Sequence, residues 1–98
     1  MSNDPSQKTR TVRAALDTDS QYGAVVPPIH LTSTFSFAAY GEKRAYDYSR
    51  SGNPTRDALA GALADLEGGA GAVVVSSGMA AVSLVTQLLR SGAIAVVP

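Results

Sequence analysis

The 98-residue sequence has no cysteine and only one histidine, His30. Without cysteine, the chain cannot form a disulfide framework or a thiolate metal site. A single histidine cannot by itself form a zinc or iron site. Eight basic and eight acidic side chains give a formal net charge of zero and are interspersed along the chain. This pattern lacks the features of a nucleic-acid groove or of binding to an anionic membrane surface.

Long apolar segments are missing as well. No apolar run approaches the roughly 20 residues that a membrane-spanning helix needs. Residues 1–10 are polar and lack the hydrophobic core of a secretory signal. We therefore expect a cytoplasmic protein with neither a membrane nor a nucleic acid as partner. The length allows at most one small domain, and a composition of 45% apolar and 16% charged residues is that of a globular protein.

The first 40 residues show little helical or strand periodicity. Residues 11–16 are compatible with one helical turn, and we expect the extreme N-terminus to be mobile. Pro27 and Pro28 exclude a helix around them, so residues 21–39 are predicted to be extended. Because no hairpin partner follows, we interpret this extended arm as a segment that docks onto another subunit. A long surface loop is the alternative.

Clear secondary-structure signals begin at Asn53, a helix N-cap that is followed by Pro54 at the first helical position. Gly68 and Gly69 stop this helix. Four segments are predicted from the apolar spacing and follow in this order: a helix at 54–67, a buried strand at 70–76, a helix at 79–90 and a strand at 93–97. Such an alternation indicates an α/β protein.

A candidate anion site lies where the first predicted strand passes into the second helix, at Ser76, Ser77, Gly78 and Met79. The first N–H groups of a helix have no intrahelical partner, and the helix dipole adds partial positive charge there. Phosphate binds readily to such a terminus. An ordinary strand-to-helix turn is the alternative, since neither a Walker P-loop nor a Rossmann fingerprint is present.

A second candidate segment is Tyr46–Arg56. The Arg50 guanidinium can bind two phosphate oxygens, and the Tyr48 hydroxyl can donate a further hydrogen bond. Asp47 can bind an amino group. The alternatives are a surface arginine beside a half-buried tyrosine, and an exposed loop aspartate. Arg56 is poorly placed for the helix dipole, so we expect another role for it, such as an ion pair with Asp47 or Asp57.

Taken in order, four motifs of this chain resemble the trans-sulfuration family, the pyridoxal-phosphate (PLP) enzymes of cysteine and methionine metabolism. They are Val25–Ile29, Tyr48–Arg56, Leu66–Gly69 and Ser77–Ala80. The resemblance covers roughly residues 11–98. It implies the N-terminal part of a fold type I PLP-dependent transferase. Residues 1–40 would form an arm that packs on the partner subunit, and residues 41–98 the start of the PLP-binding large domain.

The resemblance also implies roles for single residues. Ser77, Gly78 and Met79 would bind the PLP phosphate of their own subunit, the last two through backbone N–H groups. Tyr48 and Arg50 would reach the PLP phosphate of the neighbouring subunit in a homotetramer built as a dimer of dimers. Asp47 matches an acidic position near the amino-acid substrate.

Within the family, residues 21–31 are most similar to bacterial cystathionine γ-synthases. This implies formation of cystathionine from O-succinylhomoserine and cysteine, in methionine biosynthesis. Cystathionine γ-lyase, cystathionine β-lyase, methionine γ-lyase and homoserine-ester sulfhydrylase are the alternatives, because they share the motifs.

The family's catalytic lysine falls beyond position 98, and neither Lys8 nor Lys43 lies in its motif. We therefore expect this chain to be an N-terminal fragment without catalytic activity of its own. Two alternatives belong to other classes of protein. One is a non-catalytic binding or oligomerisation module, and the other is a phosphate-binding α/β protein without PLP.

Overall fold

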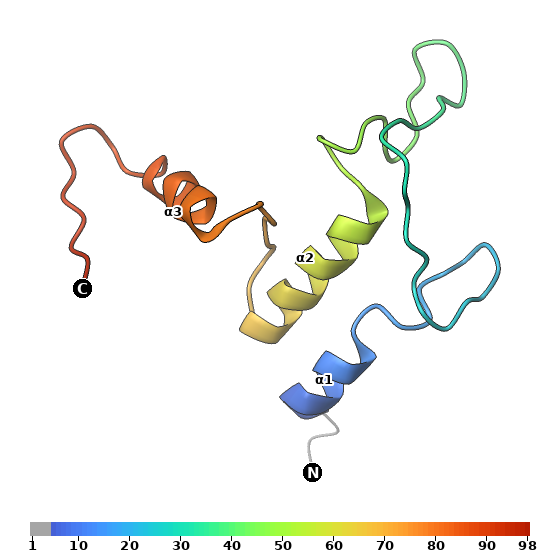
Figure 1. Ribbon diagram of the computed structural model, residues 1–98, viewed down its shortest axis with the longest axis horizontal. Helices are drawn as coiled ribbons and strands as arrows, with labels where there is room; N and C mark the ends of the chain where they lie inside the picture. Colours follow the sequence, from blue (N-terminus) through green and yellow to red (C-terminus); the bar gives the residue numbers. More distant parts are fainter. Residues whose placement is uncertain (1–4) are drawn as a thin grey trace.

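The computed structural model describes residues 5–98, so the expected mobility of residues 1–4 lies outside the described part. Three helices form in residues 5–98, and no strand: α1 (Gln7–Arg13), α2 (Pro54–Glu67) and α3 (Gly78–Thr86). Long irregular segments join them in an open arrangement with extents of 50 × 50 × 22 Å (Figure 1). No apolar side chain of this part is buried, and none of its helices has the length and apolarity to cross a membrane.

Helix α2 has the predicted bounds, and its caps explain them. Asn53 Oδ1 accepts a hydrogen bond from the Thr55 N–H at 2.9 Å, and Pro54 occupies the first turn. At the other end Gly68 has a φ of 65°, the left-handed conformation that glycine adopts without a Cβ clash. The Gly69 N–H then donates to the Ala64 carbonyl at 2.8 Å and closes the helix.

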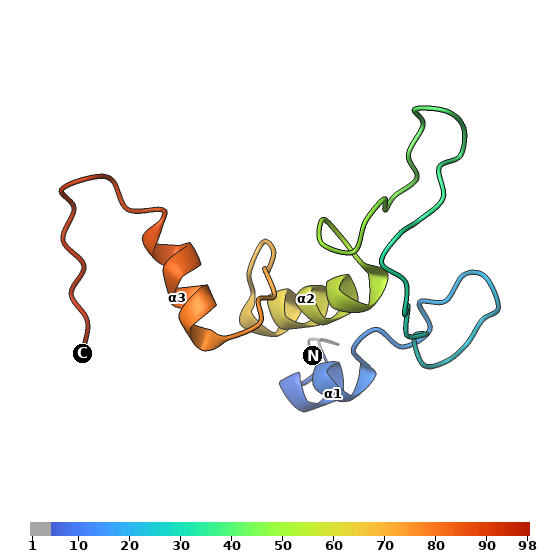
Figure 2. The same cartoon turned by 45° about the horizontal axis from the view of Figure 1, so that its top comes forward.

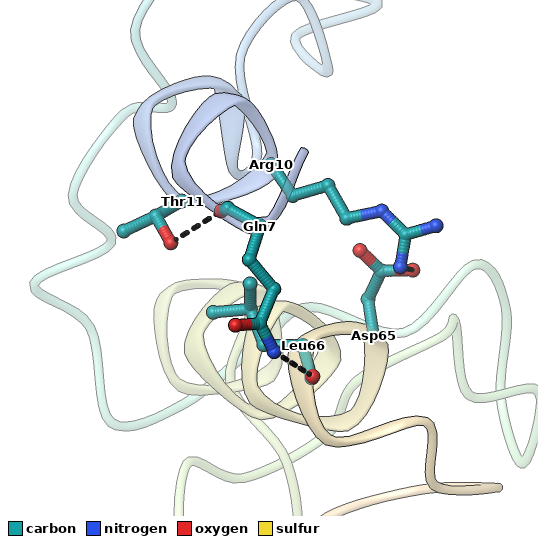
Figure 3. A network of polar contacts seen from close by, with 5 residues as sticks. All are labelled: Gln7, Arg10, Thr11, Asp65 and Leu66. Carbon is teal, nitrogen blue, oxygen red and sulfur yellow. Dashed lines mark hydrogen bonds and ion pairs between the residues drawn. The ribbon is translucent and has the colours of Figure 1, made fainter. Parts of the chain in front are cut away.

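Helix α1 begins earlier than the helical turn expected at residues 11–16, because Ser6 caps it. The Ser6 Oγ accepts from the Thr9 N–H at 3.3 Å. The helix lies beside α2, and α1 and α2 are the one pair of helices in contact in residues 5–98 (Figures 1 and 2). Figure 3 shows the polar contacts between them: Gln7 Nε2 donates to the Leu66 carbonyl at 3.2 Å, and Arg10 lies 3.9 Å from the Asp65 carboxylate.

The extended arm has a partner within its own chain, contrary to the expectation from the sequence. The Phe35 N–H donates to the Asp47 carbonyl and the Ser49 N–H to the Ser33 carbonyl, both at 2.9 Å. These bonds flank an isolated antiparallel bridge between Thr34 and Tyr48. The expectation that the arm lacks a pairing partner in its own chain was wrong, because the pairing spans only a few residues and leaves no alternating pattern in the sequence. Docking of the rest of the arm onto another subunit stays a prediction.

The two predicted strands, 70–76 and 93–97, do not form in residues 5–98. A strand needs a hydrogen-bonded neighbour, and neither segment finds one there. Helix α3 is also shorter than the predicted 79–90. After Gln87 the backbone bonds tighten, and Leu88 and Leu89 donate to carbonyls three residues back at 3.1 Å.

Candidate functional site

The N-terminus of α3 is an open cluster of backbone donors. Ser77 is the N-cap, and its Oγ accepts from the Ala80 N–H at 3.1 Å. Its carbonyl accepts from the Ala81 N–H at 3.2 Å. The N–H groups of Gly78 and Met79 have no acceptor within residues 5–98. A Cβ built on Gly78 would meet nothing within 4 Å, so a ligand can approach these donors closely.

This arrangement suits an anion, because two unpaired N–H groups lie at the positive end of the helix dipole. The Ser77 hydroxyl uses its oxygen for the cap and keeps its hydrogen for a further bond. Met79 is 72% exposed, so the terminus is open to solvent. The predicted residues therefore present two open backbone N–H groups and one hydroxyl, groups of the kind that can bind a phosphate. Binding of a phosphate by Ser77, Gly78 and Met79 stays a prediction.

Tyr48 and Arg50 form a second group of donors. The Arg50 guanidinium carbon lies 5.3 Å from the centroid of the Tyr48 ring, within the range of a cation–π contact. Tyr48 is 42% exposed and Arg50 is exposed. Neither the Tyr48 hydroxyl nor the Arg50 guanidinium has a hydrogen-bond acceptor in the described part of the chain. The pair presents one full positive charge and several free donors to solvent, as an anion-binding pair does.

The structure does not bring these two groups of donors together in one chain. The segment at residues 46–52 lies at the N-terminal end of α2, whereas α3 follows the C-terminal end of α2 (Figures 1 and 2). Within one subunit, a single phosphate therefore cannot bridge them in this conformation.

Asp47 is held by its neighbours in a way that leaves its carboxylate partly open. Its Oδ1 accepts from the Tyr48 N–H at 2.8 Å, and its Oδ2 lies 3.5 Å from the Lys43 ammonium. The side chain is 32% exposed. The carboxylate therefore already pairs with an ammonium group, the charge type that the amino group of an amino acid would present.

Between Tyr48 and Arg50, Ser49 is fixed by four hydrogen bonds that the sequence did not predict. Its N–H donates to the Ser33 carbonyl at 2.9 Å, and its Oγ donates to the Thr32 carbonyl. The Oγ also accepts from Asn53 Nδ2 at 3.0 Å. Its carbonyl accepts from Arg56 Nη1 at 2.7 Å. All polar groups of Ser49 thus bind the chain itself.

Asn53 has two functions of which the sequence indicated one. As predicted, it caps α2. In addition, its Nδ2 donates to the His30 carbonyl at 3.3 Å, while the His30 N–H donates to Thr55 Oγ1 at 2.9 Å. Asn53 is 9% exposed, and it is the one buried residue of the described part. These bonds tie the arm to the start of α2.

The expected ion pair of Arg56 with Asp47 or Asp57 does not form within residues 5–98. Arg56 instead donates to backbone carbonyls, those of Ser49 and Arg50. Asp57 accepts a hydrogen bond from the Tyr46 hydroxyl at 2.9 Å. That bond, together with some burial and the carboxylate charge, raises the pKa of Tyr46 above its ordinary value of 10.0. The sequence feature that indicated another role for Arg56 was its positive charge in the first turn of α2, where the helix dipole disfavours a cation.

In the described residues there is no group of three or more histidine, cysteine or acidic side chains that could hold a metal ion. The polar groups gathered at α3 and at Tyr48–Arg50 are hydrogen-bond donors. Such donors suit an anionic ligand.

Comparison with known proteins gives consistent relationships. The chain is 57% identical over 93 residues to cystathionine γ-synthase from Escherichia coli K12, covering 94% of this chain and 24% of that protein. It is 45% identical over 87 residues to a cystathionine β-lyase from Lactococcus lactis, covering 89% and 23%. The crystal structure of cystathionine γ-synthase from Xanthomonas oryzae pv. oryzae in complex with cystathionine superposes with a TM-score of 0.81 at 58% identity, over 86% and 22% of the two chains.

The chain therefore spans about a quarter of the length of the relatives that it matches, and it corresponds to their N-terminal part. These relatives have the fold type I architecture, so the predicted fold class is confirmed. The model of the family described as "Cys/Met metabolism PLP-dependent enzyme" matches residues 8–98. The chain thus belongs to the Cys/Met metabolism family of PLP-dependent enzymes.

Proposed function

We propose that this chain supplies the phosphate-binding elements of a PLP-dependent enzyme of the cystathionine γ-synthase type. The observation that carries the proposal is the N-terminus of α3. There Ser77 caps the helix and leaves the N–H groups of Gly78 and Met79 without an acceptor in the described part of the chain.

The residues fit the phosphate of PLP in two groups. Ser77, Gly78 and Met79 bind it in their own subunit with the hydroxyl and two backbone N–H groups. Tyr48 and Arg50 come from the neighbouring subunit and add a hydroxyl donor and a guanidinium fork. The separation of the two groups within one chain supports this sharing (Figure 1). The proposed assembly is a homotetramer, a dimer of dimers, in the cytoplasm.

The proposed reaction is a γ-replacement on an activated homoserine ester, O-succinylhomoserine. The bond from the γ-carbon to the ester oxygen breaks, and the cysteine sulfur bonds to the γ-carbon. The thiol proton leaves with the released carboxylate, and cystathionine is the product. When bound, PLP supplies the electron sink for this chemistry. Asp47 is proposed to lie near the substrate. There its carboxylate would attract the ammonium group of the amino-acid substrate, as it attracts the Lys43 ammonium in this structure.

Proton transfer is not assigned to this chain. A PLP enzyme needs a lysine that holds the cofactor and moves protons. Lys43 pairs with Asp47, and Lys8 lies on α1 away from the candidate site. We therefore propose that residues 1–98 alone have no catalytic activity and act by binding and orienting.

A hybrid enzyme tests the proposal. In it, this chain replaces the matching N-terminal segment of the E. coli cystathionine γ-synthase, to which it is 57% identical. We expect the hybrid to bind PLP and to form cystathionine from O-succinylhomoserine and cysteine. Arg50→Ala should weaken PLP binding by about tenfold or more, because a charge-assisted contact to the phosphate is lost.

Two outcomes would overturn the proposal. A folded hybrid without PLP affinity would contradict the assigned phosphate site. A hybrid that binds PLP and splits cystathionine but does not form it would indicate the lyase reaction, which the similarity to cystathionine β-lyase makes the second candidate.

A further inference from the structure

Ser49 lies between the two side chains that are proposed to bind the phosphate of the neighbouring subunit. Its N–H, hydroxyl and carbonyl groups are all used in bonds to its own chain. A residue held at each of its polar groups cannot rotate freely. The backbone on either side of Ser49 is therefore fixed before a ligand binds. The directions in which the Tyr48 and Arg50 side chains leave the backbone are fixed with it.

Arg56 makes two hydrogen bonds to backbone carbonyls of the Tyr48–Arg50 segment. Nη1 donates to the Ser49 carbonyl at 2.7 Å, and Nη2 donates to the Arg50 carbonyl at 3.3 Å. Two successive carbonyls are thus held by one planar guanidinium, a geometry that lysine cannot reproduce. The Ser51 and Gly52 N–H groups donate to the Tyr48 carbonyl at 3.0 and 3.1 Å. These two backbone bonds hold the turn that follows Tyr48.

Arg56 occupies a position in α2 at which a positive charge does not stabilise the helix. It lies in the first turn, where the dipole disfavours a positive charge. It also forms no ion pair with a carboxylate of the described residues. Its contacts with the segment before α2 offset this disadvantage, and they link the rigid helix to the proposed phosphate-binding pair.

We infer that Arg56 is a positioning residue, which holds the Tyr48–Arg50 segment in the conformation that binds the phosphate. The inference rests on the proposed function. Without Arg56, the segment would have to be ordered when the phosphate binds, and the affinity would fall by that ordering cost. Arg56 itself does not touch the cofactor.

The test compares PLP with pyridoxal, which lacks the phosphate, by titrating the apo form of the hybrid enzyme. Arg56→Ala is expected to weaken PLP binding by roughly tenfold, through lost preorganisation, and to leave pyridoxal binding nearly unchanged. Arg56→Lys should recover only part of the loss, because it can hold one carbonyl. Arg90→Ala is the matched control, since Arg90 is exposed and follows α3, whereas this segment precedes α2 in the chain.

Combination with Arg50→Ala identifies the route of the effect. If Arg56 acts through Arg50 and Tyr48, the double variant should lose little more PLP affinity than Arg50→Ala alone. Unchanged PLP affinity in Arg56→Ala, equal losses for PLP and pyridoxal in both Arg56 variants, or fully additive losses would each overturn the inference. If Arg50→Ala and Tyr48→Phe also leave PLP binding unchanged, the proposed function fails instead.

Discussion

The Ser77 Oγ accepts a hydrogen bond from the Ala80 N–H at 3.1 Å, and this bond fixes the start of α3. The cap satisfies the Ala80 N–H, the third backbone donor of α3. The N–H groups of Gly78 and Met79, which precede it, remain available to a ligand. One serine thus stabilises the helix and defines which backbone groups face the proposed phosphate.

Two substitutions of Ser77 should separate these effects in the hybrid enzyme. Ser77→Ala removes the cap, so we expect a loss of about 1 kcal/mol in unfolding free energy together with weaker PLP binding. Ser77→Asp keeps a capping oxygen but adds a negative charge beside the phosphate. Its stability should stay near that of the parent, while its PLP affinity falls by roughly tenfold or more.

Thermal melts and PLP titrations measure both quantities. Ser83→Ala is the control, because Ser83 lies within α3 and takes part in a side-chain hydrogen bond only through its carbonyl, which accepts from Thr86 Oγ1 in the described part of the chain. Undiminished PLP binding by Ser77→Asp would contradict the phosphate assignment at α3.

Asn53 should be the most sensitive polar position before α2. Asn53→Ala removes the cap and the two bonds from Nδ2, so we expect a loss of about 2 kcal/mol in unfolding free energy. Ser6→Ala, which removes the cap of the short exposed α1, should cost less than about 1 kcal/mol. Chemical denaturation of the hybrid and both variants measures the difference. Equal losses would show that the contacts of Asn53 with the arm contribute nothing.

What the sequence predicted well was local. The bounds of α2 follow from Asn53, Pro54 and Gly68, because capping depends on residues close in sequence. The donors at Gly78 and Met79 follow from the same rule. The bond from Asn53 to the His30 carbonyl spans 23 residues, and no short-range pattern encodes such a contact. The strands failed for a related reason: an apolar run such as 70–76 becomes a strand only where a neighbour pairs with it.

The Tyr46–Asp57 hydrogen bond predicts a dependence of stability on alkaline pH. The pKa of Tyr46 is raised in the folded state, so folding favours the protonated hydroxyl. This contribution is fully present below the ordinary pKa of 10.0 and is lost as pH rises through the folded value. The unfolding free energy of the hybrid should therefore fall more steeply above pH 10 than that of Tyr46→Phe. Parallel pH profiles for the two proteins would show that the bond does not form.

The isolated 98-residue chain should not unfold cooperatively. No apolar side chain is buried in residues 5–98, and Leu31, Leu88 and Val96 are among the most exposed. Without buried apolar area, little opposes the conformational entropy of the chain. Calorimetry should show no sharp transition, and a dye that binds exposed apolar surface should bind. A cooperative melt of the chain alone would instead favour a self-sufficient binding or oligomerisation module.

Subunit complementation tests most directly whether two subunits share the phosphate site. One hybrid subunit carries Arg50→Ala, and the other keeps Arg50 but lacks the catalytic lysine in its E. coli part. The lysine-free subunit is expected to be inactive alone, and the Arg50→Ala subunit to have little activity at a PLP concentration that saturates the parent but not this variant. If Arg50 reaches the neighbouring site, mixed dimers contain one complete site, and activity should return to roughly a quarter of the parent value for random association. If activity does not return in dimers shown to be mixed, Arg50 acts within its own subunit and the proposed sharing is contradicted.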